Sequence, residues 1–412
     1  MNVPLPITVI ATGPHGFPGA SQVMCTNLAA MALLHWNTAY VGLEEPFLFS
    51  VIGRGKTKCT FVVAPHSSAM GTGRAIAGPA SLVTDALTEG IVSAALEETR
   101  QGSRVILWGN YLWIYGRAVL AASSLLRAEH GITLDTWITP TGSDIWEIGP
   151  QLPQVTSRLL NSRLISSIVV YSRKFAGEIA ERFHLRRPYT VIPPALDNAR
   201  FHPVGRDIKD ACRARLGIPV RNFVISSHSN MRPVKAPEDV LATAEAVALL
   251  SDRQVTLLMI GPRPSLRTPS ARNKCQVIWT GVQRHVEEYL WASDVELNCS
   301  LHDSFNLSLL EAMGCGLPCT TTDVVGIADE IIECEGGYVY ALNTYKSGCS
   351  PRVDDGAVRY LLGLVNNASI ACATGLRAAK FMKSVFSPNA IAKSYENLLE
   401  KPSDANRGQR LP

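Results

Sequence analysis

Short apolar runs alternate with longer amphipathic stretches along most of the chain. The first run, Ile7–Ala11, precedes a segment rich in glycine and proline and then an apolar helical stretch over about residues 21–34. Short apolar runs bounded by turn residues are typical of buried strands, whereas longer runs with three-to-four spacing are typical of helices. Because strands and helices take turns, the pattern predicts parallel sheets with helices on both faces.

The same pattern gives the expected bounds of the remaining elements. Strands are expected at 59–64, 104–108, 134–139, 167–171, 189–192, 222–227, 255–261, 276–280, 294–299, 319–322 and 337–340. Helices are expected at about 79–100, 115–130, 152–163, 173–183, 238–250, 284–292, 355–365, 369–384 and 390–399, with a short helix before residue 222. Residues 193–209 carry closely spaced prolines and a glycine, which predicts a linker between two α/β domains.

Residues 299–332 carry the most chemical content. Asp303 and Glu311 lie eight positions apart, and apolar residues recur at three-to-four spacing over 307–317 before Pro318 forbids further helix. Ser304 is expected to cap this helix, with Asp303 just ahead of its N-terminus and Glu311 one to two turns inside it. Free N–H groups at a helix N-terminus suit a phosphate or another anion. The alternative is a buried helix with a solvated carboxylate at its start.

Arg232 and Lys235 lie in another loop that follows an expected strand, just before the helix over 238–250. Arginine offers phosphate a planar, permanently charged fork, and lysine a mobile point charge. Since the carboxyl ends of parallel strands share one edge of a sheet, both cations should face the helix N-terminus near Ser304. Together they could neutralise a diphosphate. The alternative is a pair of ordinary surface cations.

Two loops of the first half end expected strands in the same way. Residues 12–20 run Thr-Gly-Pro-His-Gly-Phe-Pro-Gly-Ala, and residues 140–144 run Pro-Thr-Gly-Ser-Asp. The first loop does not match the dinucleotide fingerprint Gly-x-Gly-x-x-Gly and lacks the Lys-Ser/Thr ending of a P-loop. Open α/β sheets bind ligands at this edge, although a plain turn would give the same pattern.

Composition narrows the classes of function. The chain has 412 residues, is 46% hydrophobic and 18% charged, and carries a formal net charge of +4, so it can bury the cores of two or three domains. No dense Lys/Arg block is present, which argues against nucleic-acid binding. The ten cysteines form no Cys-x-x-Cys pair and are expected to be reduced thiols of a cytoplasmic protein.

Several other classes lack their signatures. No basic segment precedes the first apolar run, as a secretion signal requires, and no stretch reaches the ~18 apolar residues of a membrane helix. The sequence has no Asp-x-Asp, His-Glu-x-x-His or paired-cysteine motif, so no metal-ligand constellation is visible. The Gly-x-Ser-x-Gly elbow of a serine hydrolase is absent as well.

Taken together, these segments resemble the retaining glycosyltransferases of family 4, glycogen-synthase-like enzymes with the GT-B fold. Residues 303–326 are similar to the family's Glu-x7-Glu motif and the Glu-Ala-Met-x-x-Gly-x-Pro segment and glycine loop that follow. The other similar segments are 229–237 to the diphosphate-binding Arg/Lys loop, 192–203 to the Ile-Pro-Asn-Gly-Val-Asp … Phe-x-Pro linker, and 141–144 to the His-Gly-Thr-Asp loop. The chain looks closest to the mycothiol and bacillithiol glycosyltransferase branch.

The resemblance implies an α/β, GT-B architecture of two Rossmann-like, doubly wound domains that face a cleft. The implied division is an acceptor-binding domain at 1–200, a nucleotide-sugar-binding domain at 201–384, a helix at 385–400 that returns to the first domain, and a disordered tail at 401–412. It implies transfer of a sugar from a UDP- or GDP-linked donor to a small soluble acceptor, with retention of configuration and with no metal or other cofactor.

The resemblance also assigns roles to single residues. Arg232 and Lys235 would hold the donor diphosphate and stabilise the leaving group, and Asp303 would contact the donor sugar in the catalytic site. Glu311 would bind the ribose hydroxyls. Further implied nucleotide-sugar contacts are Ser304, Phe305, Asn306, Leu307, Gly281 and Gly19, and implied acceptor or sugar contacts are His15, Gly16, Thr141 and Asp144. Catalysis would come from positioning and electrostatic stabilisation, without a protein nucleophile.

Some positions depart from the family pattern. Asp303 replaces the usual Glu, Asn306 stands where Gly is usual, Thr141 replaces a His that contacts the sugar, and Pro194-Ala195 replaces Asn-Gly. The sugar half of the site is therefore altered, which indicates an unusual sugar or acceptor, as in a natural-product pathway, or reduced activity. The branch also includes enzymes that attach a thiol to a sugar in lincosamide antibiotic assembly, and S-glycosylation would fit such a pocket.

Two other functions stand beside sugar transfer. An epimerase with the GT-B fold would place carboxylates and a histidine in the cleft without a Glu-x7-Glu-like motif, so the sequence disfavours it. A degenerate nucleotide-sugar-binding protein without transferase activity is kept open by Thr141 and Asn306. The nucleotide base, the sugar, the acceptor and the linkage formed stay open. So does the oligomeric state, for which a homodimer is one alternative.

Overall fold

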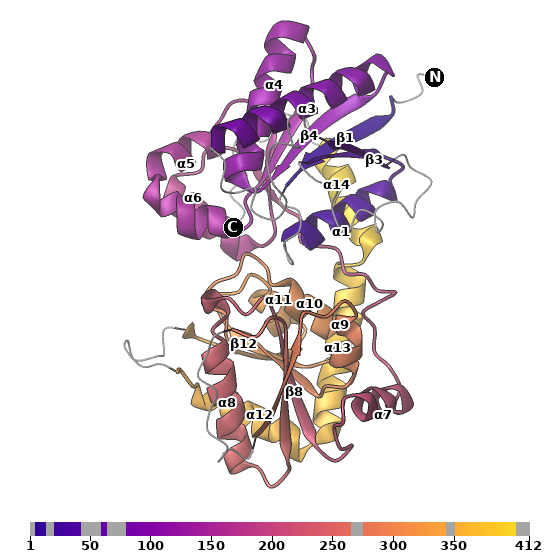
Figure 1. Ribbon diagram of the computed structural model, residues 1–412, viewed down its shortest axis with the longest axis vertical. Coiled ribbons are helices and arrows are strands. Elements are labelled where there is room, and N and C mark those ends of the chain that lie inside the picture. Colours follow the sequence, from indigo (N-terminus) through magenta and orange to yellow (C-terminus); the bar gives the residue numbers. More distant parts are fainter. Residues whose placement is uncertain are drawn as a thin grey trace. The chain divides into compact units, whose positions relative to one another are not determined.

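The computed structural model describes residues 5–13, 20–42, 59–63, 80–264, 275–342 and 351–400. The chain divides into two compact units, Met1–Ala195 with Pro388–Pro412, and Leu196–Ser387. Each unit is a parallel sheet flanked by helices (Figure 1). The break after Ala195 falls within the segment predicted to be a linker.

In the first unit, strands and helices alternate as the apolar runs predict. Its strands are β1 (Ile7–Thr12), β2 (Asn37–Gly42), β3 (Cys59–Val63), β4 (Arg104–Asn110), β5 (Asp135–Thr139), β6 (Ser167–Val170) and β7 (Tyr189–Val191). Its helices are α1 (Ala20–Ala32), α3 (Ala80–Arg100), α4 (Arg117–His130), α5 (Pro153–Leu160), α6 (Arg173–Phe183) and α14 (Pro388–Glu400). Among the described residues the sheet has seven strands in the order β3-β2-β1-β4-β5-β6-β7, and every neighbouring pair is parallel.

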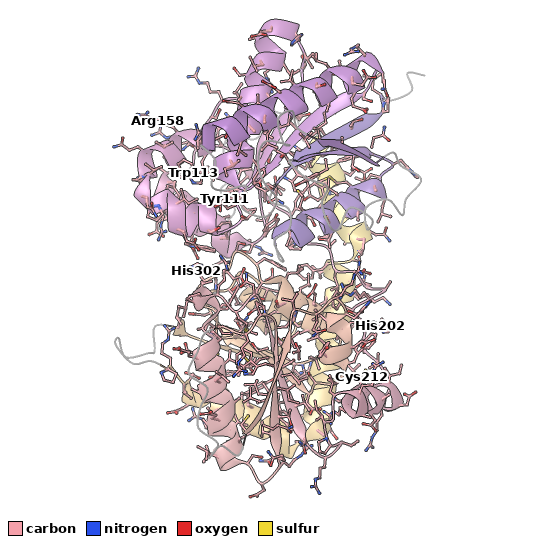
Figure 2. All side chains as sticks on the ribbon, in the orientation of Figure 1. Tyr111, Trp113, Arg158, His202, Cys212 and His302 are labelled. Carbon is pink, nitrogen blue, oxygen red and sulfur yellow. The ribbon has the colours of Figure 1, made fainter. Side chains whose placement is uncertain are left out.

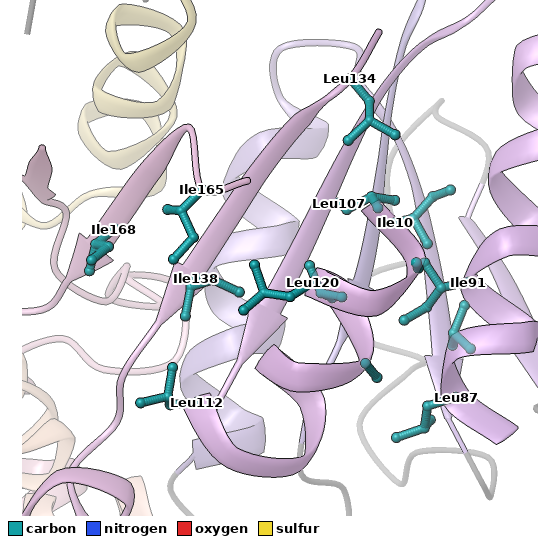
Figure 3. Packing of buried hydrophobic residues seen from close by; sticks show 14 of the residues in the cluster. Ile10, Leu87, Ile91, Leu107, Leu112, Leu120, Leu134, Ile138, Ile165 and Ile168 are labelled. Atoms are coloured by element: carbon teal, nitrogen blue, oxygen red, sulfur yellow. The ribbon is translucent and has the colours of Figure 1, made fainter. Parts of the chain in front are cut away.

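Both faces of this sheet are covered. Successive side chains of a strand point to opposite faces. Ile10 and Leu107 therefore join the core beneath α3 and α4 (Figure 3), whereas Trp108 joins the core beneath α1 and α14. α14 packs on α1, and the Asn27 amide donates a 3.0 Å hydrogen bond to the Tyr395 hydroxyl. The last described helix of the chain thus belongs to the first unit.

The second unit repeats the design. Its strands are β8 (Phe223–His228), β9 (Val255–Ile260), β10 (Cys275–Gly281), β11 (Val295–Leu297), β12 (Cys319–Thr322) and β13 (Gly337–Tyr340). Its helices are α7 (Arg206–Arg215), α8 (Pro237–Leu250), α9 (Val286–Trp291), α10 (Leu307–Gly314), α11 (Ala328–Glu333), α12 (Asp355–Asn366) and α13 (Ala368–Val385). The described strands form a parallel sheet in the order β10-β9-β8-β11-β12-β13. Ile225 and Leu257 pack toward α8 and α12, and Val224 and Leu258 toward α9.

Three local features differ from the expected elements. The strand β2 was not expected, because its run Asn-Thr-Ala-Tyr-Val-Gly begins with two polar residues and ends in glycine; it pairs on both sides, with β1 and β3. The six-residue helix α11 was not expected either. The helix expected at 115–130 begins at Arg117, because a π-helical turn, Leu112–Gly116, follows Tyr111, whose φ is 85°.

The order of the strands sets where ligands can bind. In the second unit, β8 to β10 run toward one edge of the sheet and β11 to β13 toward the other, so the connections diverge between β8 and β11. In the first unit the same divergence lies between β1 and β4. Open parallel sheets bind ligands at such switch points, beyond the carboxyl ends of the strands.

Candidate functional site

The loops that follow β8 and β11 meet at the switch point of the second unit. The Leu301 N–H donates to the Val234 carbonyl across 2.8 Å, which joins the two loops. Arg232 and Lys235 lie on the first loop, and Asp303 lies on the second, next to His302 (Figure 2). The loop that carries the two cations therefore contacts the 299–332 stretch, because both follow parallel strands of one sheet.

Lys235 and Asp303 form an ion pair. Lys235 Nζ donates to Asp303 Oδ2, and each side chain retains only about a sixth of its surface in contact with solvent. Lys235 ends a tight turn between residues in the left-handed region, Met231 and Ala236. Arg232, in the same turn, is exposed. The ion pair holds the lysine cation beside the start of α10.

The second loop is fixed by backbone bonds to the segment after β12. The Gly326 N–H donates to the Asp303 carbonyl across 3.0 Å, and the Ile327 N–H donates to the Phe305 carbonyl across 2.9 Å. The Phe305 side chain is buried, with its ring 5.6 Å from that of Phe386. Phe305 is therefore a core residue through its side chain, and any ligand contact there falls to its backbone.

Asn306, rather than Ser304, caps α10. Its φ and ψ are 85° and 84°, and its Oδ1 accepts the Leu309 N–H across 3.1 Å. The expectation for Ser304 is wrong, because the helix begins three residues later, at Leu307. Asparagine is among the few residues other than glycine that adopt the left-handed region readily. The left-handed backbone at position 306 therefore suits both asparagine and the glycine that the family pattern has there.

Glu311 lies one turn inside α10, as predicted, and it is buried. Its Oε2 lies 3.1 Å from Nε2 of His228, whose Nδ1 lies 3.0 Å from Glu296 Oε1. Burial alone would lower the pKa of His228, but the charge of Glu296 and hydrogen bonds to both carboxylates raise it to about 10. Sequence reasoning assigned no role to His228 or Glu296. A glutamate within an otherwise apolar strand was the available signal.

The part of the chain that forms this site matches a known family. Residues 222–347 match the family model described as glycosyl transferases group 1. The matched range lies within the second unit. All the site residues described so far lie within the matched range.

Two relatives illustrate the similarity in sequence. A Bacillus anthracis protein named N-acetyl-alpha-D-glucosaminyl L-malate synthase is 30% identical over 185 residues, which are 44% of this chain and 46% of that protein. A D-inositol 3-phosphate glycosyltransferase from Jonesia denitrificans is 28% identical over 279 residues, 61% of this chain and 62% of that protein. The aligned region thus spans less than two thirds of either relative.

Solved structures show the fold. Sucrose-phosphate synthase from Thermosynechococcus elongatus matches with a TM-score of 0.66 at 16% identity, covering 95% of this chain and 98% of that chain. The Anabaena protein HepE, solved in complex with UDP and glucose, matches with a TM-score of 0.65 at 14% identity, covering 95% and 99%. The prediction of a GT-B fold with two Rossmann-like units is confirmed.

Gly281 and Leu307 complete the predicted contacts in the second unit. Gly281 ends β10 with a φ of 71°, and its carbonyl accepts the Gly261 N–H across 3.0 Å. Since β10 is parallel to its neighbour β9, Gly281 lies at the same edge of the sheet as Lys235. Leu307 is the first residue of α10. The structure brings these positions to one edge, and their roles stay predictions.

In the first unit, Asp144 has a structural position. It is fully buried, and its carboxylate accepts the N–H groups of Thr141, Gly142 and Leu112 at 2.7 to 3.1 Å. Burial raises the pKa of this carboxyl, and the three N–H donors oppose that shift. Asp144 therefore shapes the turn after β5 and has no exposed surface for a sugar. The direct contact expected of it is not supported by this geometry.

Of the other residues predicted in the first unit, the structure describes only Thr141. Thr141 is half-buried on the turn that Asp144 closes. His15, Gly16 and Gly19 lie outside the described residues. Tyr111 and Trp113, labelled in Figure 2, follow β4 at the switch point, and the Trp113 indole donates to the Asp144 carbonyl across 3.1 Å. Neither was singled out from the sequence.

Three further observations concern metal sites, membrane-spanning helices and cysteines. The described residues contain no group of three or more His, Cys, Asp or Glu placed to hold a metal ion. Within the same residues, no helix has both the length and the apolar character that crossing a membrane demands. Free thiols are found at Cys25, Cys212, Cys275, Cys299, Cys315, Cys319, Cys334 and Cys372, and the first six of these are buried.

Proposed function

We propose that this chain transfers a sugar from a UDP- or GDP-linked donor to a small acceptor, with retention of configuration and without a metal. The observation that carries the proposal is the ion pair of Lys235 and Asp303 at the β8–β11 switch point, just ahead of α10, the helix that carries Glu311. A cation, two carboxylates and helix N–H groups match the parts of a nucleotide diphosphate sugar: phosphates, sugar hydroxyls and ribose.

The chemistry follows from the charge that develops on the leaving diphosphate. Lys235 is held beside α10 by its ion pair with Asp303, so its charge is already in place and costs little reorganisation in the transition state. Exposed Arg232 adds a bidentate donor. With the leaving group so stabilised, the acceptor attacks the anomeric carbon of the sugar from the face that the diphosphate leaves. The chain's residues contribute positioning and electrostatics, and the acceptor supplies the nucleophile.

The relatives support a small acceptor. One is named for a malate derivative and others for inositol 3-phosphate, both compact molecules that carry hydroxyl groups and negative charge. HepE was solved with UDP and glucose, which supports a uridine donor. The resemblance to thiol-related enzymes extends the proposal to small thiols and to S-glycosylation in natural-product assembly.

A thermal-shift screen with UDP, GDP, ADP and dTDP tests the donor class first. A nucleotide that binds only the folded state raises the melting temperature by an amount that grows with the logarithm of one plus its concentration divided by Kd. One of UDP and GDP should stabilise the protein selectively. If none of the four raises the melting temperature at millimolar concentration, the proposed donor site is refuted.

Variants then test the residues. Arg232→Ala and Lys235→Ala should each weaken binding of the stabilising nucleotide by roughly tenfold or more, the value of one charge-assisted hydrogen bond. The matched controls are Arg206→Ala and Lys393→Ala, which remove surface cations that also pair with a carboxylate. If both site variants bind and turn over as the controls do, the site assignment fails.

Product analysis separates a transferase from a degenerate binder. Incubation with the matching nucleotide sugar and a panel of small hydroxyl and thiol acceptors should release nucleotide diphosphate and yield a glycoside with the anomeric configuration of the donor, read by NMR. Activity should persist in EDTA. Tight nucleotide binding without transfer to any acceptor would instead favour the non-catalytic alternative.

A further inference from the structure

A chain of three buried ionisable side chains lies behind the nucleotide site. Glu296 is in β11, His228 ends β8, and Glu311 is in α10. The imidazole of His228 lies between the two carboxylates, at 3.0 Å from Glu296 Oε1 and 3.1 Å from Glu311 Oε2. Glu296 is held in turn by the His228 backbone N–H at 2.9 Å and the Ser226 hydroxyl at 2.5 Å. The chain thus connects the middle of the sheet to Glu311.

Both contacts are hydrogen bonds to carboxylates when the histidine is charged. A neutral imidazole has one N–H, so one of its two nitrogens would point a lone pair at a carboxylate oxygen. With both nitrogens protonated, each donates to a carboxylate. The raised pKa of His228 agrees with this state. The nearby thiols of Cys315 and Cys319 stay neutral, because burial raises the pKa of each.

Such an arrangement is costly as a purely structural device. Glu296 is fully buried within the short strand β11, between the apolar residues Val295 and Leu297. Replacing buried ionic groups by apolar ones of similar volume often leaves stability unchanged or improves it. A buried charge chain that ends on a site residue is therefore better explained by what it does to that residue.

We propose that His228, anchored by Glu296, is a positioning residue that fixes the orientation of the Glu311 carboxylate so that it accepts ribose hydroxyls. This inference rests on the proposed function, since a nucleotide supplies the ribose. The imidazolium holds Oε2 of Glu311 from within the protein, so the carboxylate does not rotate when a nucleotide binds. Preorganisation of this kind adds affinity only for ligands that carry the hydroxyls.

The test compares ligands that differ only in those hydroxyls. Calorimetry measures the affinity of UDP and GDP and of their 2′,3′-dideoxy analogues for the wild type, His228→Gln and Glu296→Gln. The wild type should prefer the ribonucleotide by about tenfold or more, the value of hydrogen bonds to a charged group. In both variants that preference should fall at least threefold, with the affinity of the dideoxy analogue unchanged. His285→Gln is the control, because its ring also contacts a glutamate at 3.1 Å but is largely exposed.

A second readout needs neither a variant nor a ligand. In the free wild-type protein at pH 8, ¹⁵N spectra should show both ring nitrogens of His228 protonated, whereas an ordinary histidine is neutral at that pH. A neutral His228 overturns the inference. Equal losses for the ribonucleotide and dideoxy ligands in the variants also overturn it, because they would mean a general structural role. A wild type that binds neither UDP nor GDP refutes the proposed function, whereas binding with undiminished discrimination in His228→Gln refutes this inference alone.

Discussion

Replacing Asn306 tests the backbone geometry that starts α10. Asn306→Ala and Asn306→Gly both remove the cap to Leu309 and both remove the buried Nδ2, which has no hydrogen-bond partner in the described structure. The two variants differ in the cost of a φ of 85° and in the entropy of the unfolded residue. A residue with a Cβ pays about 1–2 kcal/mol in the left-handed region, and the greater entropy of unfolded glycine returns part of that difference.

The glycine variant should therefore be more stable than the alanine variant by about 1 kcal/mol. For a unit of this size, that difference corresponds to roughly 2–4 °C in the melting temperature. Differential scanning calorimetry of both variants, with the wild type alongside, measures it. An alanine variant that melts at or above the glycine variant would refute the claim that the backbone, and not the amide, selects the residue at this position.

Three further predictions concern stability. The free energy of unfolding should fall as the pH rises from about 6.5 toward 10, by up to about 1.4 kcal/mol per pH unit. The reason is that His228 keeps in the folded state a proton that the unfolded chain releases. Urea titrations at three pH values measure this slope, and His228→Gln should lack it. Asp144→Asn should destabilise the first unit by about 1–3 kcal/mol, since an amide NH₂ would face backbone N–H donors such as that of Leu112, and thermal melts that match the wild type would contradict this. Gly375→Ala should destabilise the second unit by at least about 1–3 kcal/mol, because its Cβ would meet the Gly316 carbonyl oxygen at 1.8 Å; Gly363→Ala, where a Cβ meets nothing within 4 Å, is the control.

Most of the fold follows from local sequence. Apolar runs separated by turn residues locate the strands, and the alternation with helices requires parallel sheets, because a parallel connection needs a crossover helix. The failures are β2 and α11, which form although the local pattern does not predict them. The order of the strands cannot be predicted from local sequence, although this order brings together the loops that carry Lys235 and Asp303.

The candidate site, like the fold, has features that the sequence determines and features that depend on tertiary structure. By itself, the sequence determined which loops carry charge at the carboxyl ends of strands and placed Glu311 one turn inside a helix, since these depend on residue type and on periods of two and 3.6. Only the tertiary structure decided that the Leu112 N–H donates to Asp144 and that His228 bridges Glu296 and Glu311. Long-range hydrogen bonds join residues dozens of positions apart, and no local pattern records which buried polar groups will find one another.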